Sequence, residues 1–256
     1  MSATSTEETQ RGKSGTRLFH DSCLVVIPAA NEQESITHVV RDLRDRGFAH
    51  IRVIDTGSAD SIALRARAAG AEVSREPRCG FGQACPRGLD DIPNGIAWIL
   101  FCNGDGSDDL DNWDILIEGR HDADLVIGSR AGRRTIARVQ RLANWFLTKL
   151  VEYGWGVRFA DFGPLRRLRR EALDVLDMRH HGSGWNVVMQ IRAVEARLKI
   201  KEVPVRSRLL ELRRSTFERS IVDAGRAASG ILQAVARLYV GGGTGSAMPR
   251  QQSAGA

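Results

Sequence analysis

Short apolar runs alternate with segments of helical periodicity along most of the chain. The first run ends at Pro28, and apolar residues then recur at the spacing of one helix face until Gly47. The same alternation predicts strands at residues 24–27, 51–54, 71–74, 97–102, 124–127 and 200–205. It predicts helices at residues 36–47, 63–69, 112–118, 136–151 and 184–196. This order favours an α/β fold with a mostly parallel sheet covered by helices on both faces.

The ends of three predicted strands carry the polar residues of most interest. In open parallel sheets, ligands bind beyond the carboxyl ends of the strands, so the loops after Ile27, Ile54 and Cys102 should share one crevice. The first loop contains Asn31 and Glu32, which are suited to the start of a helix with or without a ligand.

The other two loops present carboxylates. Asp55 ends the second strand, where it can accept hydrogen bonds from a base or a ribose. The third loop, Asn103 to Asp109, contains three aspartates in a glycine-rich turn. Crowded carboxylates repel, so this loop is either a Mg²⁺ or Mn²⁺ site or a solvated acidic turn, and composition alone does not choose between them. A glycine-rich stretch around Gly82 offers backbone amides to a phosphate, on a weak pattern.

Composition limits the organisation of the protein. A chain of 256 residues with 42% hydrophobic residues supports one substantial core, so one catalytic domain at residues 22–205 is expected. Residues 1–21 and 241–256 are polar and are expected to be a disordered leader and tail. The four cysteines form no C-x-x-C pair, which argues against disulfides and structural zinc.

Charge indicates anionic partners. The net charge is +6, and residues 206–240 form a segment rich in arginine that is expected to be helical. Charged residues interrupt the apolar stretch at residues 221–240, so it is expected to lie on a membrane rather than cross it. A cytoplasmic protein, peripheral on the inner face of the membrane, is the resulting expectation. Nucleic acid is not an expected partner, because no helix-turn-helix, zinc-finger or RNA-binding signature is present.

Several spaced motifs resemble one family. They are Val26 to Glu32, Val53 to Asp60, Asp105 to Asp109, Gly128-Ser129-Arg130 and Asp161 to Arg166. In this order they resemble family-2 glycosyltransferases of the GT-A fold, and most closely those that transfer sugars to dolichyl or polyprenyl phosphate. The resemblance implies a GT-A sheet with a Rossmann-like nucleotide-binding part, a nucleotide diphosphate sugar as donor, a lipid phosphate as acceptor, and Mg²⁺ or Mn²⁺ as cofactor.

The resemblance also implies roles for individual residues. The donor site would comprise Pro28, Ala29, Asn31, Glu32, Asp55, Gly82, Gly104 and Asp105. Asp105 would be the second acid of the metal-binding D-x-D motif, whose first position is Asn103 here, and an amide brings no negative charge to a cation. Asp161 would face the acceptor as general base or orienting group. The acceptor or its phosphate would contact Arg130, Arg166, Trp185, Arg213 and Arg214.

Two alternatives to a glycosyltransferase stay open at this point. The substitution at Asn103 fits a nucleotide-sugar-binding relative that has weakened or lost catalysis. A nucleotidyltransferase shares a related sheet, although its early phosphate loop with lysine or arginine is absent here.

Overall fold

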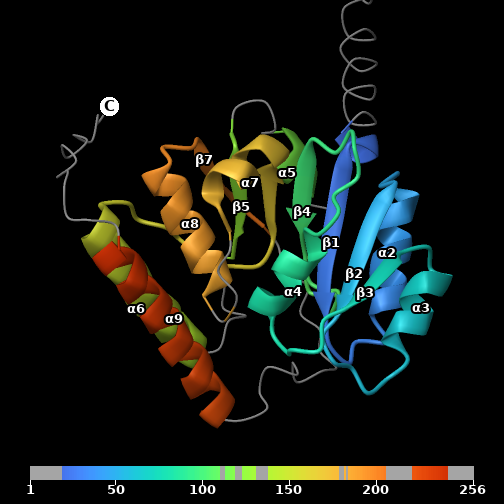
Figure 1. Cartoon of the computed structure of the whole chain (residues 1–256), viewed down its shortest axis with the longest axis horizontal. Helices are drawn as coiled ribbons and strands as arrows, with labels where there is room; N and C mark the ends of the chain where they lie inside the picture. The colour runs from blue at the N-terminus through green and yellow to red at the C-terminus, as the bar shows by residue number, and fades with distance from the viewer. Residues whose placement is uncertain are drawn as a thin grey trace, which may run out of the picture.

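The computed structural model shows one central sheet between two layers of helices (Figure 1). The structure describes residues 19–109, 113–118, 123–130, 138–178, 182, 184–205 and 221–241. The sheet has seven strands in these residues, in the order β3-β2-β1-β4-β6-β5-β7. Its strands are β1 (Cys23–Ala29), β2 (His50–Asp55), β3 (Glu72–Arg75), β4 (Trp98–Phe101), β5 (Leu125–Ser129), β6 (Arg166–Arg169) and β7 (Ile200–Pro204).

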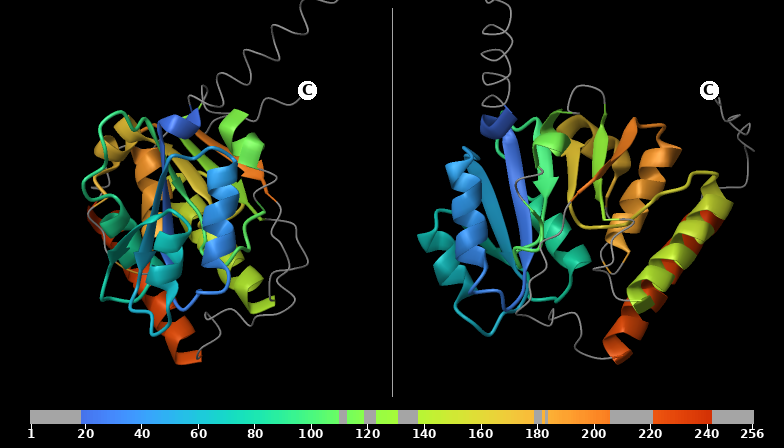
Figure 2. Two further views of the ribbon diagram at one scale, coloured as in Figure 1. Left: turned by 90° about the vertical axis from the view of Figure 1, so that its right-hand side faces the viewer. Right: turned by 180° about the vertical axis from the view of Figure 1, so that it is seen from behind.

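Helices cover both faces of this sheet (Figure 2). One face packs against α2 (Ile36–Asp45), α3 (Ile62–Ala68) and α5 (Trp113–Glu118). The other face packs against α4 (Phe81–Gly88), α6 (Arg138–Trp155), α7 (Arg170–Leu176), α8 (Trp185–Glu195) and α9 (Ile221–Gly241).

Strand β1 lies at the centre of the parallel part of the sheet. It pairs in parallel with β2 on one side and with β4 on the other. β6 is antiparallel to both β4 and β5, so the segment before Arg166 lies at the edge where β4 and β5 end. β5 pairs in parallel with β7. The carboxyl ends of β1, β2, β4 and β5 therefore lie along one edge, together with the start of β6.

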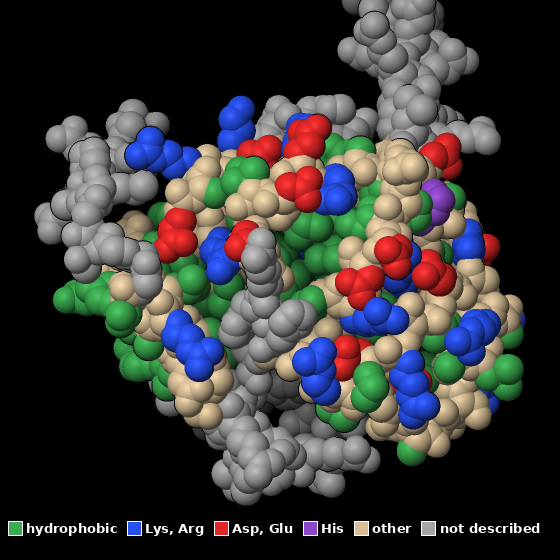
Figure 3. Space-filling model, in the orientation of Figure 1, with side chains coloured by type: hydrophobic (Ala, Val, Ile, Leu, Met, Phe, Trp, Pro, Cys, Tyr) green, Lys and Arg blue, Asp and Glu red, His purple; other side chains and the backbone are tan. Residues whose placement is uncertain are grey.

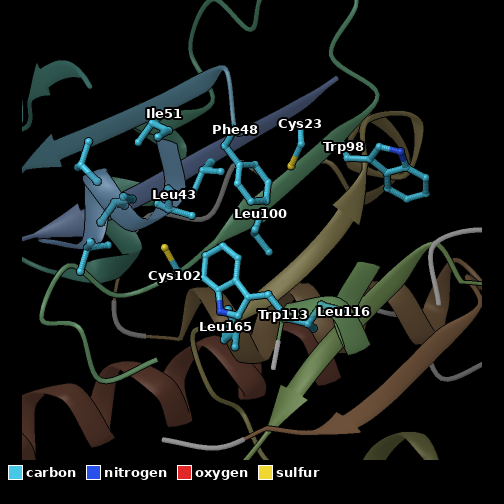
Figure 4. Packing of buried hydrophobic residues seen from close by; sticks show 14 of the residues in the cluster. Cys23, Leu43, Phe48, Ile51, Trp98, Leu100, Cys102, Trp113, Leu116 and Leu165 are labelled. Carbon is cyan, nitrogen blue, oxygen red and sulfur yellow. The ribbon is translucent and has the colours of Figure 1, made fainter. Parts of the chain in front are cut away.

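The alternation of side chains along β1 supplies two cores. Cys23, Val25 and Ile27 belong to the core under α2, α3 and α5, while Leu24 and Val26 belong to the core on the opposite face. In the first core, Phe48 and Trp113 contact each other edge to face with ring centroids 5.9 Å apart, and Leu100 and Cys102 lie beside them (Figure 4). Because both faces of the central strands are buried, their sequences are apolar runs without polar alternation.

The structure confirms the mostly parallel, helix-covered sheet that the sequence predicted, and each predicted strand and helix between residues 22 and 205 lies within a few residues of its predicted position. Three elements were not predicted: α4, β6 and α7. The glycines near Gly82 and the arginines of β6 are both atypical of regular buried elements, which is why the pattern did not indicate them.

The assigned leader needs one correction. Phe19 was assigned to the disordered leader, but it is 2% exposed and packs against Phe48 and Trp98. Phe19 therefore belongs to the packed core of the domain. The predictions for residues 1–18, 206–220 and 242–256 fall outside the described residues. Among the helices that the structure describes, none combines the length and the apolar character needed to span a membrane.

Close contact between two backbones makes one glycine necessary. A Cβ on Gly82 of α4 would lie 1.7 Å from the carbonyl oxygen of Gly182, whereas a Cβ on Gly154 of α6 would meet Tyr239 at an ordinary 3.5 Å. We predict that Gly82→Ala lowers the free energy of unfolding by about 1 to 3 kcal/mol through overpacking. Gly154→Ala should raise it by up to ~1 kcal/mol through helix propensity. Equal stabilities in urea denaturation would contradict this packing.

Candidate active site

The loops after β1 and β2 are joined by hydrogen bonds at the carboxyl edge. The backbone N–H of Asn31 donates to Ser58 Oγ at 3.0 Å, and the N–H of Ala59 donates to Asn31 Oδ1 at 3.0 Å. The N–H of Gln33 donates to Asp60 Oδ2 at 3.1 Å. These hydrogen bonds between the two loops hold the backbone of Asn31 in the left-handed conformation, at a φ of 54°.

Asp55 is held at the end of β2 within this pair of loops. It is 6% exposed, and its Oδ1 accepts a hydrogen bond from the N–H of Ser58 at 2.9 Å. Pro28 and Ala29 end the neighbouring β1 strand, paired with Ile54 and Asp55. The structure thus brings the predicted nucleotide residues Pro28, Ala29, Asn31, Glu32 and Asp55 into one place.

The acidic loop after β4 lies against the loop after β1. A Cβ on Gly104 would lie 2.6 Å from Glu32 Oε2 and 2.9 Å from the Cβ of Ala29, so only glycine allows this approach. The hydroxyl of Ser35 donates to the carbonyl oxygen of Gly104 at 2.9 Å and fixes the contact. Gly104 therefore has a packing role, and it carries Asp105 toward Glu32.

Within the acidic loop, Asp105 and Asn103 hold different positions. Asp105 Oδ1 accepts the N–H of Ser107 at 2.8 Å. The side chain of Asn103 is turned toward the loop, since its Nδ2 donates to Ser107 Oγ at 3.2 Å, while its backbone N–H donates to Asp108 Oδ2 at 2.7 Å. Asp108 is 6% exposed, so it supports the loop from beneath.

The carboxyl groups at this edge are electrostatically strained. Burial, with the negative charges of Asp105 and Asp60 added, raises the pKa of Glu32 to about 8. Burial and the charge of Asp105 raise the pKa of Asp108 to about 6, against the opposing effects of the Asn103 N–H and Arg130. The Oε2 atom of Glu32 is buried without a hydrogen-bond partner in the described part of the chain. These groups would be stabilised in their ionised forms by a nearby cation.

The donor atoms fit a hard divalent cation. Carboxylate and amide oxygens are the ligands that Mg²⁺ and Mn²⁺ prefer, and Asp105 and Asn103 offer them on either side of Gly104, which lies against the unpaired oxygen of Glu32. The described residues contain no group of three acidic, histidine or cysteine side chains arranged as a complete metal site. A cation here would need further ligands, such as water or the oxygens of a substrate phosphate.

Asp161 and Arg130 form an ion pair next to this edge. Asp161 Oδ2 accepts the backbone N–H and Nε of Arg130 at 3.1 and 2.9 Å, and its Oδ1 accepts the N–H of Phe162 at 2.8 Å. The Asp161 side chain is 4% exposed, while that of Arg130 is 25% exposed. Asp161 was predicted as general base or orienting group, and with both oxygens engaged it orients Arg130.

Glu202 of β7 is a residue that sequence reasoning missed. Its Oε1 accepts the N–H groups of Ala160 and Asp161 at 3.0 and 3.4 Å, and its Oε2 accepts the Ala160 N–H at 3.1 Å. Gln190 adds a bond from its Nε2 to the Asp161 carbonyl at 3.2 Å. Glu202 thereby fixes the loop that holds Asp161. A lone glutamate in a predicted strand gives no signal of this role.

Three other predicted site residues are placed in the interior. Arg166 is fully buried and donates to the carbonyl oxygens of Gly163 and Asn186. Trp185 is 1% exposed and contacts Phe101 with ring centroids 5.1 Å apart. Gly82 contacts Gly182. The side chains of Arg166 and Trp185, predicted to contact the acceptor, are therefore packed in the interior, and the backbone of Gly82, predicted to approach the donor phosphate, packs against Gly182. Arg213 and Arg214 lie outside the described residues.

Comparison with known proteins identifies the family. No protein-family profile matches the chain. An uncharacterized glycosyltransferase of Mycobacterium tuberculosis is 31% identical over 191 residues, which are 72% of this chain and 84% of that protein. The chain belongs to the glycosyltransferases.

Other relatives are glycosyltransferases as well. Glycosyltransferase AglJ of Haloferax volcanii is also 31% identical, over 192 residues, and the match spans only 62% of its length. Undecaprenyl-phosphate mannosyltransferase of Micrococcus luteus is 27% identical over 215 residues, which are 78% of this chain and 88% of that enzyme.

Solved structures show the same fold. Glucosyl-3-phosphoglycerate synthase of M. tuberculosis, crystallised with uridine diphosphate, superposes with a TM-score of 0.67 over 90% of this chain and 84% of that one, at 22% identity. Another crystal of that enzyme contains Mn²⁺, UDP-glucose and phosphoglyceric acid. Mannosyl-3-phosphoglycerate synthase of Rubrobacter xylanophilus superposes with a TM-score of 0.67 over 93% of this chain and 80% of its own, at 18% identity. The fold of this glycosyltransferase is thus the GT-A fold.

The raised pKa of Glu32 makes stability depend on pH. Folded Glu32 keeps its proton up to a pH of about 8, whereas the free carboxyl ionises near 4.5. The folded state therefore binds more protons across this interval, and the free energy of unfolding should fall as the pH rises. We predict that Glu32→Gln, measured with chelator present, is more stable than the native protein by about 1 to 3 kcal/mol at pH 8.

The neighbouring exposed Glu34→Gln serves as the control and should follow the native protein. Denaturant titrations between pH 6 and 8 isolate the contribution of Glu32 by difference, because Asp108, whose pKa is about 6, is present in the native protein and in both variants. Parallel slopes for the native protein and Glu32→Gln would refute the assignment.

Proposed function

We propose that this protein transfers a sugar from a nucleotide diphosphate donor to an acceptor. The observation that carries the proposal is the meeting of three loops at the carboxyl edge of a GT-A sheet, with Asp55 on one side and Glu32 and Asp105 on the other. This is the edge where open α/β sheets bind nucleotides. A structural neighbour of the same fold holds Mn²⁺ and UDP-glucose, which supports a donor of this class.

The donor site follows from the positions of these residues. Asp55 accepts hydrogen bonds from the base or ribose, and Pro28, Ala29, Asn31 and Glu32 line the pocket beside it. Asp105, with the amide oxygen of Asn103, would hold a Mg²⁺ or Mn²⁺ ion. When bound, such an ion supplies positive charge to the donor diphosphate and to the nucleotide that leaves.

For the acceptor we propose a lipid phosphate. A relative at 27% identity is named undecaprenyl-phosphate mannosyltransferase. A phosphate oxygen is already ionised at neutral pH, so its attack on the sugar needs orientation more than a general base. A role in orientation agrees with the hydrogen bonds of Asp161, whose two carboxylate oxygens both accept from protein donors. It also agrees with Arg130, whose partly exposed guanidinium can pair with a phosphate. Arg213 and Arg214 remain predicted as further phosphate contacts.

The two alternatives are less well supported than a glycosyltransferase. The comparisons name glycosyltransferases, which favours glycosyl transfer over nucleotidyl transfer. A donor-binding relative without turnover stays the second candidate, because Asn103 is an amide at a position of the metal motif.

We place the reaction at the cytoplasmic face of the membrane, where nucleotide sugars and a lipid phosphate meet.

Asp55 should contribute directly to donor affinity. Replacing it with alanine removes a buried acceptor, so we predict that Asp55→Ala weakens nucleotide diphosphate binding by about 1 to 3 kcal/mol. Asp45→Ala, at the far end of α2, should bind as the native protein does. Titration calorimetry with uridine and guanosine diphosphates measures both variants. A folded Asp55→Ala protein with native affinity would remove Asp55 from the donor site.

The metal loop can be tested from both directions. Asp105→Ala should abolish the part of donor binding that depends on Mn²⁺, since it removes the carboxylate nearest to the proposed ion. Asn103→Asp should tighten Mn²⁺ binding and raise transfer or donor hydrolysis, because it adds a negative charge to the ligand set. Titration calorimetry measures the binding of Mn²⁺ and of the donor, and product release measures transfer or donor hydrolysis. If Asn103→Asp tightens the metal without any turnover in either protein, the donor-binding alternative is the better description.

A further inference from the structure

The loop at residues 160–164, which carries Asp161, is held in place by side chains of the surrounding elements. Each of its five backbone carbonyl oxygens accepts a hydrogen bond from a side chain. The donors are Asn144 of α6, Arg166 of β6, and Asn186 and Gln190 of α8. Irregular backbone without such partners would leave buried carbonyl groups unpaired. Residues of three other elements therefore determine the conformation of this loop.

Asp161 is held at both of its main-chain groups. Its N–H donates to Glu202 Oε1 at 3.4 Å, and its carbonyl oxygen accepts a hydrogen bond from Gln190 Nε2 at 3.2 Å. With the backbone fixed, only the side-chain torsions of Asp161 could still vary. The bonds from Arg130 and Phe162 to its carboxylate fix those torsions as well. Arg130 is thereby oriented by a chain of contacts that starts at Gln190 and Glu202.

Gln190 is an unusual residue for its position. Charged side chains of both signs stand at the surface of the protein (Figure 3), whereas the polar side chain of Gln190 is 0% exposed. Its Oε1 atom has no hydrogen-bond partner among the described residues. An unpaired buried amide oxygen costs free energy, and a methionine of nearly the same shape would fill the space without that oxygen. The contribution of the glutamine therefore lies in the bond that it donates to Asp161.

Asn186 repeats this pattern one turn earlier on α8. Its Nδ2 donates to the carbonyl oxygen of Phe162 at 3.4 Å, and its Oδ1 is buried without a partner in the part of the chain that the structure describes. Asn186 and Gln190 thus use their NH₂ groups on consecutive carbonyl groups of the loop and leave their oxygens unpaired. Two amides in the same unfavourable state, one turn apart on one helix, indicate that this face of α8 serves to hold the loop.

Glu202 is also unfavourable where it lies. Burial raises the pKa of Glu202, the N–H groups of Ala160 and Asp161 oppose this effect, and the negative charge of Asp161 adds to it. Two carboxyl groups placed close together repel each other when both are ionised. Gln190 and Glu202 therefore share one property, because each reduces stability and each holds a main-chain group of Asp161. Departures of this kind from favourable packing are expected at functional sites.

We propose that Gln190 is a positioning residue for Arg130. Together with Glu202 it holds the main chain of Asp161, and Asp161 directs the partly exposed guanidinium of Arg130. A guanidinium that is already held in one direction binds a phosphate without first losing conformational freedom. The purpose of this positioning rests on the proposed transfer to a phosphate, whereas the orientation of Arg130 does not. Gln190 acts through Asp161 and Arg130 and touches no substrate itself.

The orientation of Arg130 can be measured without any substrate. Its Nε–H is protected from exchange by the bond to Asp161 and should give a proton–nitrogen NMR signal that Arg130→Lys identifies by its loss. In Gln190→Met this signal should shift, and its exchange with water should become about tenfold faster. Unfolding of Gln190→Met in urea should occur at nearly the native concentration, because the substitution removes one unpaired oxygen and leaves another on Asp161.

Calorimetry with geranyl phosphate, a soluble lipid phosphate, measures the consequence for binding. Gln190→Met should weaken its binding by about tenfold, because a small displacement of an orienting group has a large effect. Nucleotide diphosphate affinity should not change. Glu202→Ala should act in the same direction, and Glu202→Gln, which keeps an acceptor oxygen, should recover most of the loss. The control is Glu195→Met, which removes a hydrogen bond of 2.8 Å between α8 and Trp155 instead of one to the loop, and should behave like the native protein.

The outcomes separate this role from the proposed function. A native Arg130 signal and native geranyl phosphate affinity in Gln190→Met would overturn the positioning role and leave the proposed function standing. Loss of stability together with phosphate binding in Gln190→Met, without any effect of Glu202→Ala on the Arg130 signal, would also overturn it, because Gln190 would then serve packing alone. If the native protein binds no geranyl phosphate while the Arg130 signal responds to both variants, the positioning role is confirmed and the proposed acceptor is wrong.

Discussion

The central position of β1 determines where the chemistry of this protein lies. Because β1 pairs in parallel with β2 and β4, their carboxyl ends meet, and the loops that follow them must pack against one another. Gly104 allows the loop after β4 to lie directly against Glu32 and Ala29 of the loop after β1, because it has no side chain. The result is a concentration of carboxyl groups whose ionisation is unfavourable in the absence of positive charge, as the raised pKa values of Glu32 and Asp108 indicate. A site of this kind is suited to a cation and to the phosphates that a cation binds.

The antiparallel strand β6 completes the arrangement. It reverses the chain so that Asp161 arrives at the same edge from the opposite direction, next to Arg130 at the end of β5. Glu202 then fixes the backbone at Asp161, and Asp161 in turn fixes the guanidinium of Arg130. One face of the edge is therefore acidic and the other presents an oriented arginine. That polarity matches a reaction in which a cation-bound donor meets an anionic acceptor.

Much of this could be predicted from the sequence, for identifiable reasons. Apolar runs such as Val25 to Ile27 are long and buried on both faces, so their pattern indicates parallel strands directly. Asn31, Asp55 and Asp105 follow such runs, and the sheet geometry then brings them together. The interior positions of Arg166 and Trp185 could not be predicted. In sequence, an arginine that donates to backbone carbonyl groups looks the same as one that binds a phosphate, and a buried tryptophan looks the same as one that stacks on a sugar. Glu202 depends on a contact across about forty residues that no local pattern records.

The position of the cation and the nucleotide tests this account most directly. Crystals grown with Mn²⁺ and a nucleotide diphosphate should give an anomalous difference peak within direct coordination distance of Asp105, with the diphosphate on the ion and the nucleoside against Asp55 and the loop of Asn31 and Glu32. A peak that does not touch Asp105, or a nucleotide bound away from the ends of β1 and β2, would contradict it.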